Sequence, residues 1–171
     1  MFGLTVVDEF YNDYRQLVAL LEGPDTASLR VSMSDKLSRA LVLVIANFYE
    51  GEIKEILLNL FRTGSTSPLI PPFLQSSMER KYHEYFDWKA QNANKFFAMF
   101  GDDFRRQAIE DVRNGRELEE GVQAFMEIGR MRNVLAHEQL LGVPLPKTAD
   151  EYYTLHQKAL VFIQYLRESL V

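Results

Sequence analysis

Three side chains that can do chemistry lie together near the end of a late helical segment, in the stretch RNVLAH at residues 132–137. Arg132 carries a permanent planar charge that can stabilise a phosphate or pair with a carboxylate. His137 titrates near neutral pH, so it can accept or donate a proton. Asn133 lies one helical turn before His137. These residue types suit proton transfer beside a charged ester.

The rest of the composition excludes several other chemistries. The chain has 171 residues and no cysteine, which excludes disulfides, thiolate metal sites and a cysteine nucleophile. No histidine has a second ligand at metal-binding spacing, and no glycine-rich phosphate loop occurs, so we expect neither a metal nor a cofactor. His83 and His156 have no such partner, and we expect them at the surface or in packing.

The charge pattern argues against a general electrostatic binder of nucleic acid, because the net charge is -5. Residues 80–132 nevertheless hold ten of the nineteen Lys and Arg residues. Acidic residues are equally dense there, which favours solvated helix faces. The N-terminus lacks a basic region before its apolar residues, and no apolar run is long enough to cross a bilayer. We therefore expect one soluble cytoplasmic domain over residues 1–171, without a membrane partner.

The hydrophobic periodicity is helical almost throughout, which predicts an all-α multi-helix bundle. The second helix is apolar nearly all round, as is typical of a central helix or of one that also faces a second subunit. The other signals are capping boxes at 76–79 and at Thr148 with Glu151. The predicted helices are Thr5 to Glu22, Ser32 or Ser34 to Arg62, 76–86, 87–101, 102–115, 117–140, and a last one from Thr148 onward.

Arg132 falls on the face of its helix that should pack, whereas Asn133 and His137 share a neighbouring strip. Arg132 and His137 are about 140° apart around a straight helix. The arginine could swing toward the histidine, the helix could bend, or the two could meet across a dimer axis. A buried arginine needs a partner or a function. One alternative is therefore an internal ion pair with Glu50, Glu52 or Glu55.

Arg132, Asn133 and His137 fit the pattern R-N-x-x-x-H, and the chain resembles the HEPN superfamily of small all-α domains. It is most similar to the stand-alone RiboL-PSP-type members, which also carry a segment like NANKFFAMFG between the core helices. The similarity spans roughly residues 30–170. It implies a four-helix core with additional helices and a metal-independent endoribonuclease that acts as a homodimer, frequently a toxin or phage-defence effector with an antitoxin partner. Glu50 matches a position where such families often carry an acid that supports the site, although a solvated or core-rim carboxylate is an equal alternative.

This chemistry agrees with what the residues can do. RNA supplies its own nucleophile, the 2′-hydroxyl, so an RNase needs only proton transfer and charge stabilisation. The motif has one histidine per chain, which is few for a mechanism that needs both a general acid and a general base. A two-fold axis between two chains would bring two such histidines together. Tyr49, Tyr82, Tyr85 and Trp88 could stack on bases, yet their helical spacing favours the core. The alternatives are a non-catalytic HEPN-like interaction or nucleotide-binding module, and a helical scaffold whose motif is accidental.

Overall fold

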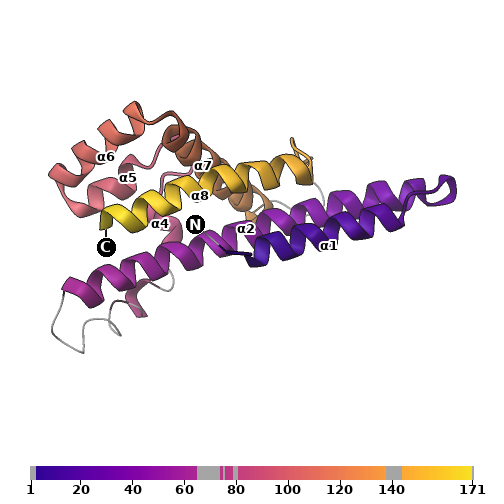
Figure 1. Cartoon of the computed structure of the whole chain (residues 1–171), viewed down its shortest axis with the longest axis horizontal. Helices are drawn as coiled ribbons and strands as arrows, with labels where there is room; N and C mark the ends of the chain where they lie inside the picture. The colour runs from indigo at the N-terminus through magenta and orange to yellow at the C-terminus, as the bar shows by residue number, and fades with distance from the viewer. Residues whose placement is uncertain (1–2, 65–73, 75, 79–80, 138–143, 171) are drawn as a thin grey trace.

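The computed structural model describes residues 3–64, 74, 76–78, 81–137 and 144–170, with the backbone alone for His137. These residues form helices and no strand, which confirms the predicted all-α class (Figure 1). None of the helices within these ranges is long and apolar enough to cross a membrane. The elements are α1 (Val6–Leu20), the 3₁₀ turn η1 (Pro24–Thr26), α2 (Ala27–Gly64), α4 (Tyr82–Tyr85), α5 (Asn94–Phe97), the 3₁₀ turn η2 (Ala98–Phe100), α6 (Asp102–Asn114), α7 (Arg116–His137) and α8 (Ala149–Leu170).

Four long helices, α1, α2, α7 and α8, form the main bundle, and α7 and α8 contact each other most extensively. Their close approach depends on Gly121, because a Cβ atom there would lie 2.9 Å from the backbone oxygen of Lys158. On the other side, Tyr11 of α1 stacks on Tyr153 of α8, with ring centroids 3.9 Å apart. This arrangement confirms the predicted four-helix core with additional shorter helices.

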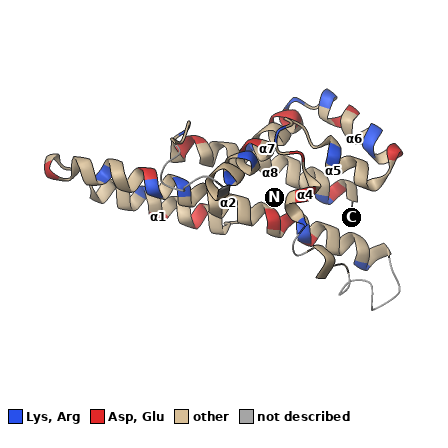
Figure 2. Ribbon diagram, turned by 180° about the vertical axis from the view of Figure 1, so that it is seen from behind, with Lys and Arg blue, Asp and Glu red and all other residues tan. Residues whose placement is uncertain are grey.

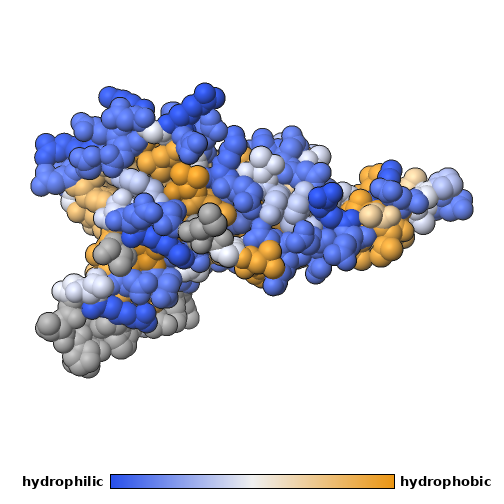
Figure 3. Space-filling model, viewed as in Figure 1, coloured by the Kyte–Doolittle hydropathy of each residue, from blue (hydrophilic) through white to orange (hydrophobic). Residues whose placement is uncertain are grey.

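Helices α1 and α2 form a long hairpin whose closed end projects beyond the other helices (Figure 1). The prediction that α2 begins at Ser32 or Ser34 is wrong, because the helix begins at Ala27. Ser34 does not cap it; its Oγ lies 3.0 Å from the Tyr14 hydroxyl of α1. Packing against α1 therefore extends the helix upstream of the capping signal. Figure 3 shows hydrophobic side chains gathered near the hairpin end, where Leu20 and Val31 are exposed.

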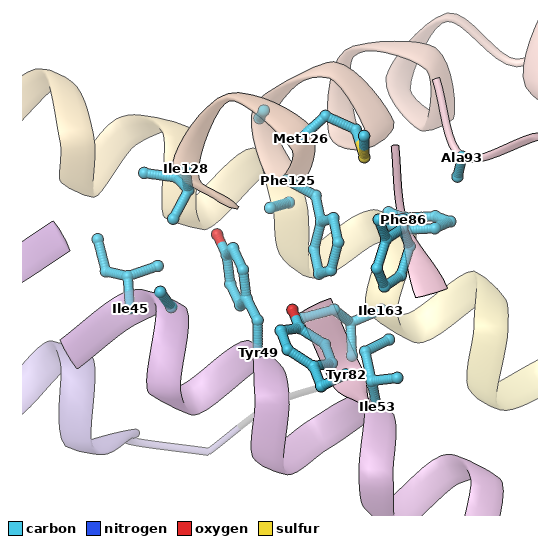
Figure 4. Close-up of a cluster of buried hydrophobic side chains, with 14 of the residues drawn as sticks. Ile45, Tyr49, Ile53, Tyr82, Phe86, Ala93, Phe125, Met126, Ile128 and Ile163 are labelled. Carbon is cyan, nitrogen blue, oxygen red and sulfur yellow. The ribbon is translucent and has the colours of Figure 1, made fainter. Parts of the chain in front are cut away.

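The middle of α2 is buried, as predicted for a central helix: Leu41, Ile45, Tyr49 and Ile53 are fully enclosed. Figure 4 shows Tyr49 reaching from α2 toward α7, where its ring stacks on Phe125 at a centroid distance of 4.8 Å. Tyr82 and Tyr85 are also buried, which confirms that these tyrosines belong to the core. His156 is fully buried too, in agreement with a packing role.

The region between α2 and α7 departs most from prediction. Residues 87–93 form no helix, and only the short α5 and η2 follow. The reason is local: Asp87 Oδ1 accepts a hydrogen bond from the Lys89 amide at 3.1 Å, and Asn92 Oδ1 accepts one from the Asn94 amide at 3.1 Å. Such side-chain bonds favour turns over helix. Glu79 of the capping box predicted at 76–79 lies outside the described residues.

The last two helices begin close to where the sequence predicts. Helix α7 begins at Arg116, one residue before the predicted start, and the predicted extension over 138–140 lies outside the described residues. The capping box before α8 is confirmed, because the Thr148 amide donates to Glu151 Oε2 at 2.7 Å and the Glu151 amide donates to Thr148 Oγ1 at 3.3 Å.

Candidate active site

Helix α7 carries all three residues of the motif near its C-terminal end. Arg132 and Asn133 are half-buried, and Nη1 of Arg132 donates a hydrogen bond to Oδ1 of Asn133 at 3.3 Å. His137 is the last described residue of α7, one turn after Asn133. The side chain of His137 lies outside the described residues, so its approach to Arg132 stays a prediction.

The ion-pair alternative for Arg132 fails for each acid that the sequence suggested. Among the described residues, no carboxylate lies within ion-pair distance of the Arg132 guanidinium. The three acids have other partners: Glu50 pairs with Lys54 at 2.6 Å, Glu52 pairs with Arg167, and Glu55 pairs with Arg62 at 3.5 Å. Arg132 therefore keeps guanidinium donors for a ligand, because its hydrogen-bond partner among the described residues is the neutral amide of Asn133.

Glu50 and Arg132 both act on the buried hydroxyl of Tyr82. Burial holds the pKa of Tyr82 well above its ordinary value of 10, the charge of Glu50 raises that pKa further, and the charge of Arg132 lowers it. Tyr82 therefore stays protonated at neutral pH, and its pKa responds to both opposite charges. Figure 4 shows its ring beside Tyr49 in the core. Glu50 bonds to Lys54 and not to the motif residues, and its supporting role stays a prediction.

Trp88 fixes residues 86–89 onto α7 one turn before the motif. A Cβ atom on Gly129 would fall within the ring of Trp88, so the tryptophan occupies the space that the missing side chain leaves. The indole Nε1 donates a hydrogen bond to the backbone oxygen of His83 at 2.9 Å. The ring also lies 5.0 Å from that of Phe86, centroid to centroid. These contacts hold the segment in one place beside Asn133.

An open pocket of about 770 Å³ lies between this segment, α5 and α7. Asn133 lines it together with Trp88 and three cations, Lys89, Lys95 and Arg130. Asn133 therefore connects the motif to the pocket, because its amide oxygen accepts the hydrogen bond from Arg132 and the same residue lines the pocket. A separate cavity of about 380 Å³ between α1, α2 and residues 145–148 contains none of the motif residues.

The sequence offered Trp88 as a residue that could stack on bases, with the core as the favoured alternative, and it did not indicate the three cations around it. Lys89 and Lys95 are more than thirty positions from Arg130 along the chain, so no local spacing connects them. The one available signal was the concentration of basic residues over 80–132. Gly129, inside a long helix, is a second signal, because such a glycine often marks a close approach.

The described residues contain no group of three or more His, Asp or Glu side chains that could hold a metal ion. Comparison with protein families gives one finding: the model of the RiboL-PSP-HEPN family matches residues 8–171, which is nearly the whole chain. Comparison with curated proteins gives no match, and comparison with solved structures gives none either.

Proposed function

The chain belongs to the RiboL-PSP-HEPN family, and on that premise we propose that it is a metal-independent endoribonuclease with Arg132 and His137 as catalytic residues. The observation that carries the proposal is the state of Arg132. The residue is half-buried, its guanidinium bonds to Asn133, and no carboxylate among the described residues pairs with it. A charge held in this way is costly unless it serves a ligand. The backbone of RNA is such a ligand.

In the proposed reaction His137 removes the proton from the 2′-hydroxyl of a ribose, and that oxygen attacks the adjacent phosphorus. A bond forms between phosphorus and O2′ while the bond between phosphorus and O5′ breaks. The products are a 2′,3′-cyclic phosphate and a 5′-hydroxyl end. Arg132 stabilises the negative charge that builds on the non-bridging oxygens, and Asn133 holds the guanidinium at Nη1.

The leaving O5′ needs a proton, and His137 of the partner subunit supplies it in a symmetric homodimer. The same two-fold axis would bring a second arginine to the phosphate. Following the family's usual role, we also propose that the protein is a cytoplasmic toxin or defence effector whose activity an antitoxin protein restrains.

The test is cleavage of a single-stranded RNA in buffer that contains EDTA. We expect the parent to produce 2′,3′-cyclic phosphate ends, and His137→Ala and Arg132→Ala to lose at least about a hundredfold in rate. Arg113→Ala, which removes an exposed cation of α6, serves as the control and should keep the parent rate. Equal cleavage by the parent and the folded His137→Ala variant would refute the proposal.

A second candidate is a non-catalytic nucleotide-binding or interaction module. Two observations favour it: the net charge of -5 and a pocket of about 770 Å³ next to Asn133, which is within the usual range for small-molecule sites. This candidate predicts a parent without RNase activity and an Arg132→Ala variant that loses dimerisation or nucleotide binding. RNA cleavage by the parent would exclude it.

A further inference from the structure

We infer that Lys89, Lys95 and Arg130 form a binding track for the phosphates of single-stranded RNA, which leads the strand to the motif at the end of α7. The inference rests on the proposed function for its substrate class. We name these residues, with Trp88, the basic groove. All three cations are exposed, and they line one pocket although they come from three separate segments of the chain.

The cations of the basic groove have no ion-pair partner among the described residues, a state that they share with about half of the other Lys and Arg side chains. Many Lys and Arg side chains of the described helices pair with carboxylates, such as Arg39 with Asp35 and Lys158 with Glu120. No such pair is recorded for the three groove cations within the described ranges. Figure 2 shows both signs of charge interspersed along the helices, whereas the pocket brings three unpaired cations together.

Asp87 is the one acid that lines the pocket, and its Oδ1 accepts a hydrogen bond from the Lys89 backbone amide. Three cations against one carboxylate leave a positive excess inside a protein whose net charge is -5. Such local charge attracts phosphates, although the whole protein does not.

The groove continues along α7 away from the motif. A second cavity, of about 270 Å³, shares Trp88, Lys89 and Arg130 and extends to Gln123. Its one acid, Glu127, is paired with Lys147 at 2.9 Å. From Gln123 to Val134 the helix rises about 16 Å, which is enough for more than one phosphate of a strand. At the other end the pocket reaches Asn133, one turn before His137. A strand in the groove therefore arrives at the proposed catalytic residues.

Trp88 makes a single strand the expected ligand rather than a duplex. The ring is half-buried and lies between the two cavities, whose walls it helps to form. Unpaired bases stack on aromatic faces, whereas the bases of a duplex are already stacked. A base placed against the exposed part of Trp88, with flanking phosphates on the lysines and Arg130, would use the ring and all three cations together.

The test uses Trp88, the only tryptophan of the chain, as the reporter. Binding of an oligouridylate of about ten nucleotides to the full-length His137→Ala protein should quench its fluorescence. The triple variant Lys89→Gln, Lys95→Gln, Arg130→Gln is compared with a control of equal charge change, Lys36→Gln, Arg105→Gln, Arg113→Gln. A thermal melt of each confirms that it is folded.

If each groove cation meets one phosphate, the triple variant loses about 2 from the slope of log affinity against log salt. That loss corresponds to roughly a hundredfold weaker binding at 0.1 M salt and about tenfold at 0.3 M. The control variant should stay within about threefold of its parent. In the background with His137 intact, the triple variant should raise KM and leave kcat nearly unchanged, because the groove holds the strand away from the reacting atoms.

The possible results separate this inference from the proposed function. Cleavage by the parent with equal RNA affinity in the triple and control variants overturns the basic groove and leaves the ribonuclease in place. RNA binding that depends on the three cations, in a parent that never cleaves, supports the groove and refutes the ribonuclease. A parent that neither quenches nor binds the oligouridylate overturns the groove.

Discussion

Replacement of Gly129 by alanine tests whether Trp88 positions the segment beside the motif. The added carbon would lie 2.7 Å from Cη2 of Trp88 and closer still to Cε3 and Cζ3. Carbon atoms in contact are about 3.5 to 4 Å apart, so the ring must move by at least about 1 Å. It cannot move freely, because its Nε1 is bonded to the His83 carbonyl and the tilted ring of Phe86 packs against it.

The expected cost combines two effects. Overpacking costs about 1 to 3 kcal/mol and loss of the indole hydrogen bond about 1 kcal/mol, while alanine regains about 1 kcal/mol of helix propensity. The net loss of about 1 to 3 kcal/mol lowers the melting temperature by roughly 2 to 10 °C. Trp88 emission should shift to the red as the ring becomes exposed.

Gly51→Ala is the matched control, because Gly51 is exposed on α2 and no atom lies within 4 Å of the added carbon. It should be neutral or stabilising by up to about 1 kcal/mol. The measurements are thermal unfolding by circular dichroism and tryptophan emission of the folded proteins. A Gly129→Ala protein as stable as Gly51→Ala, with unchanged emission, would refute the proposed position of Trp88.

Two further predictions concern pH and the motif. Burial lowers the pKa of His156 to about 4, against the weaker opposing effect of Asp8. The unfolded chain takes up this proton below about pH 6.5 and the folded protein does not, so the free energy of unfolding should fall by about 3 kcal/mol as pH drops from 6.5 to 4. His156→Phe should flatten that part of a pH series of urea melts, and parallel curves for the two proteins would contradict the assignment. Arg132→Lys keeps the charge but loses the planar pair of donors, so it should reduce RNA cleavage about a hundredfold at nearly unchanged stability; full activity would show that a point charge suffices.

The fold class was predictable because every long segment carries a helical hydrophobic period, and some helix starts also carry capping residues. The Thr148 and Glu151 pair is an example, since both of its bonds form as the local sequence indicates. The start of α2 was not predictable in this way. Its first turns are held by packing against α1, through contacts such as that of Ser34 with Tyr14, twenty positions away.

The candidate site was predictable to a similar extent. The motif gave Arg132 and Asn133, and the structure places them in contact. The choice between an ion pair and a ligand for Arg132 needed coordinates, because it depends on which cations Glu50 and the other acids of α2 meet. The basic groove also needed coordinates, since its lysines come from a non-helical segment and from α5, where tertiary contacts decide what lies nearby.

The central claim is that Arg132 and His137 of two protomers make one active site. Parent and His137→Ala chains, co-refolded in varied proportions, test it directly through the RNA cleavage rate per total protein. If one cleft needs both histidines, the rate follows the square of the parent fraction, so an equal mixture keeps about a quarter of the parent rate. A rate that falls in simple proportion, with about half remaining in the equal mixture, would show that each protomer works alone and would contradict the account.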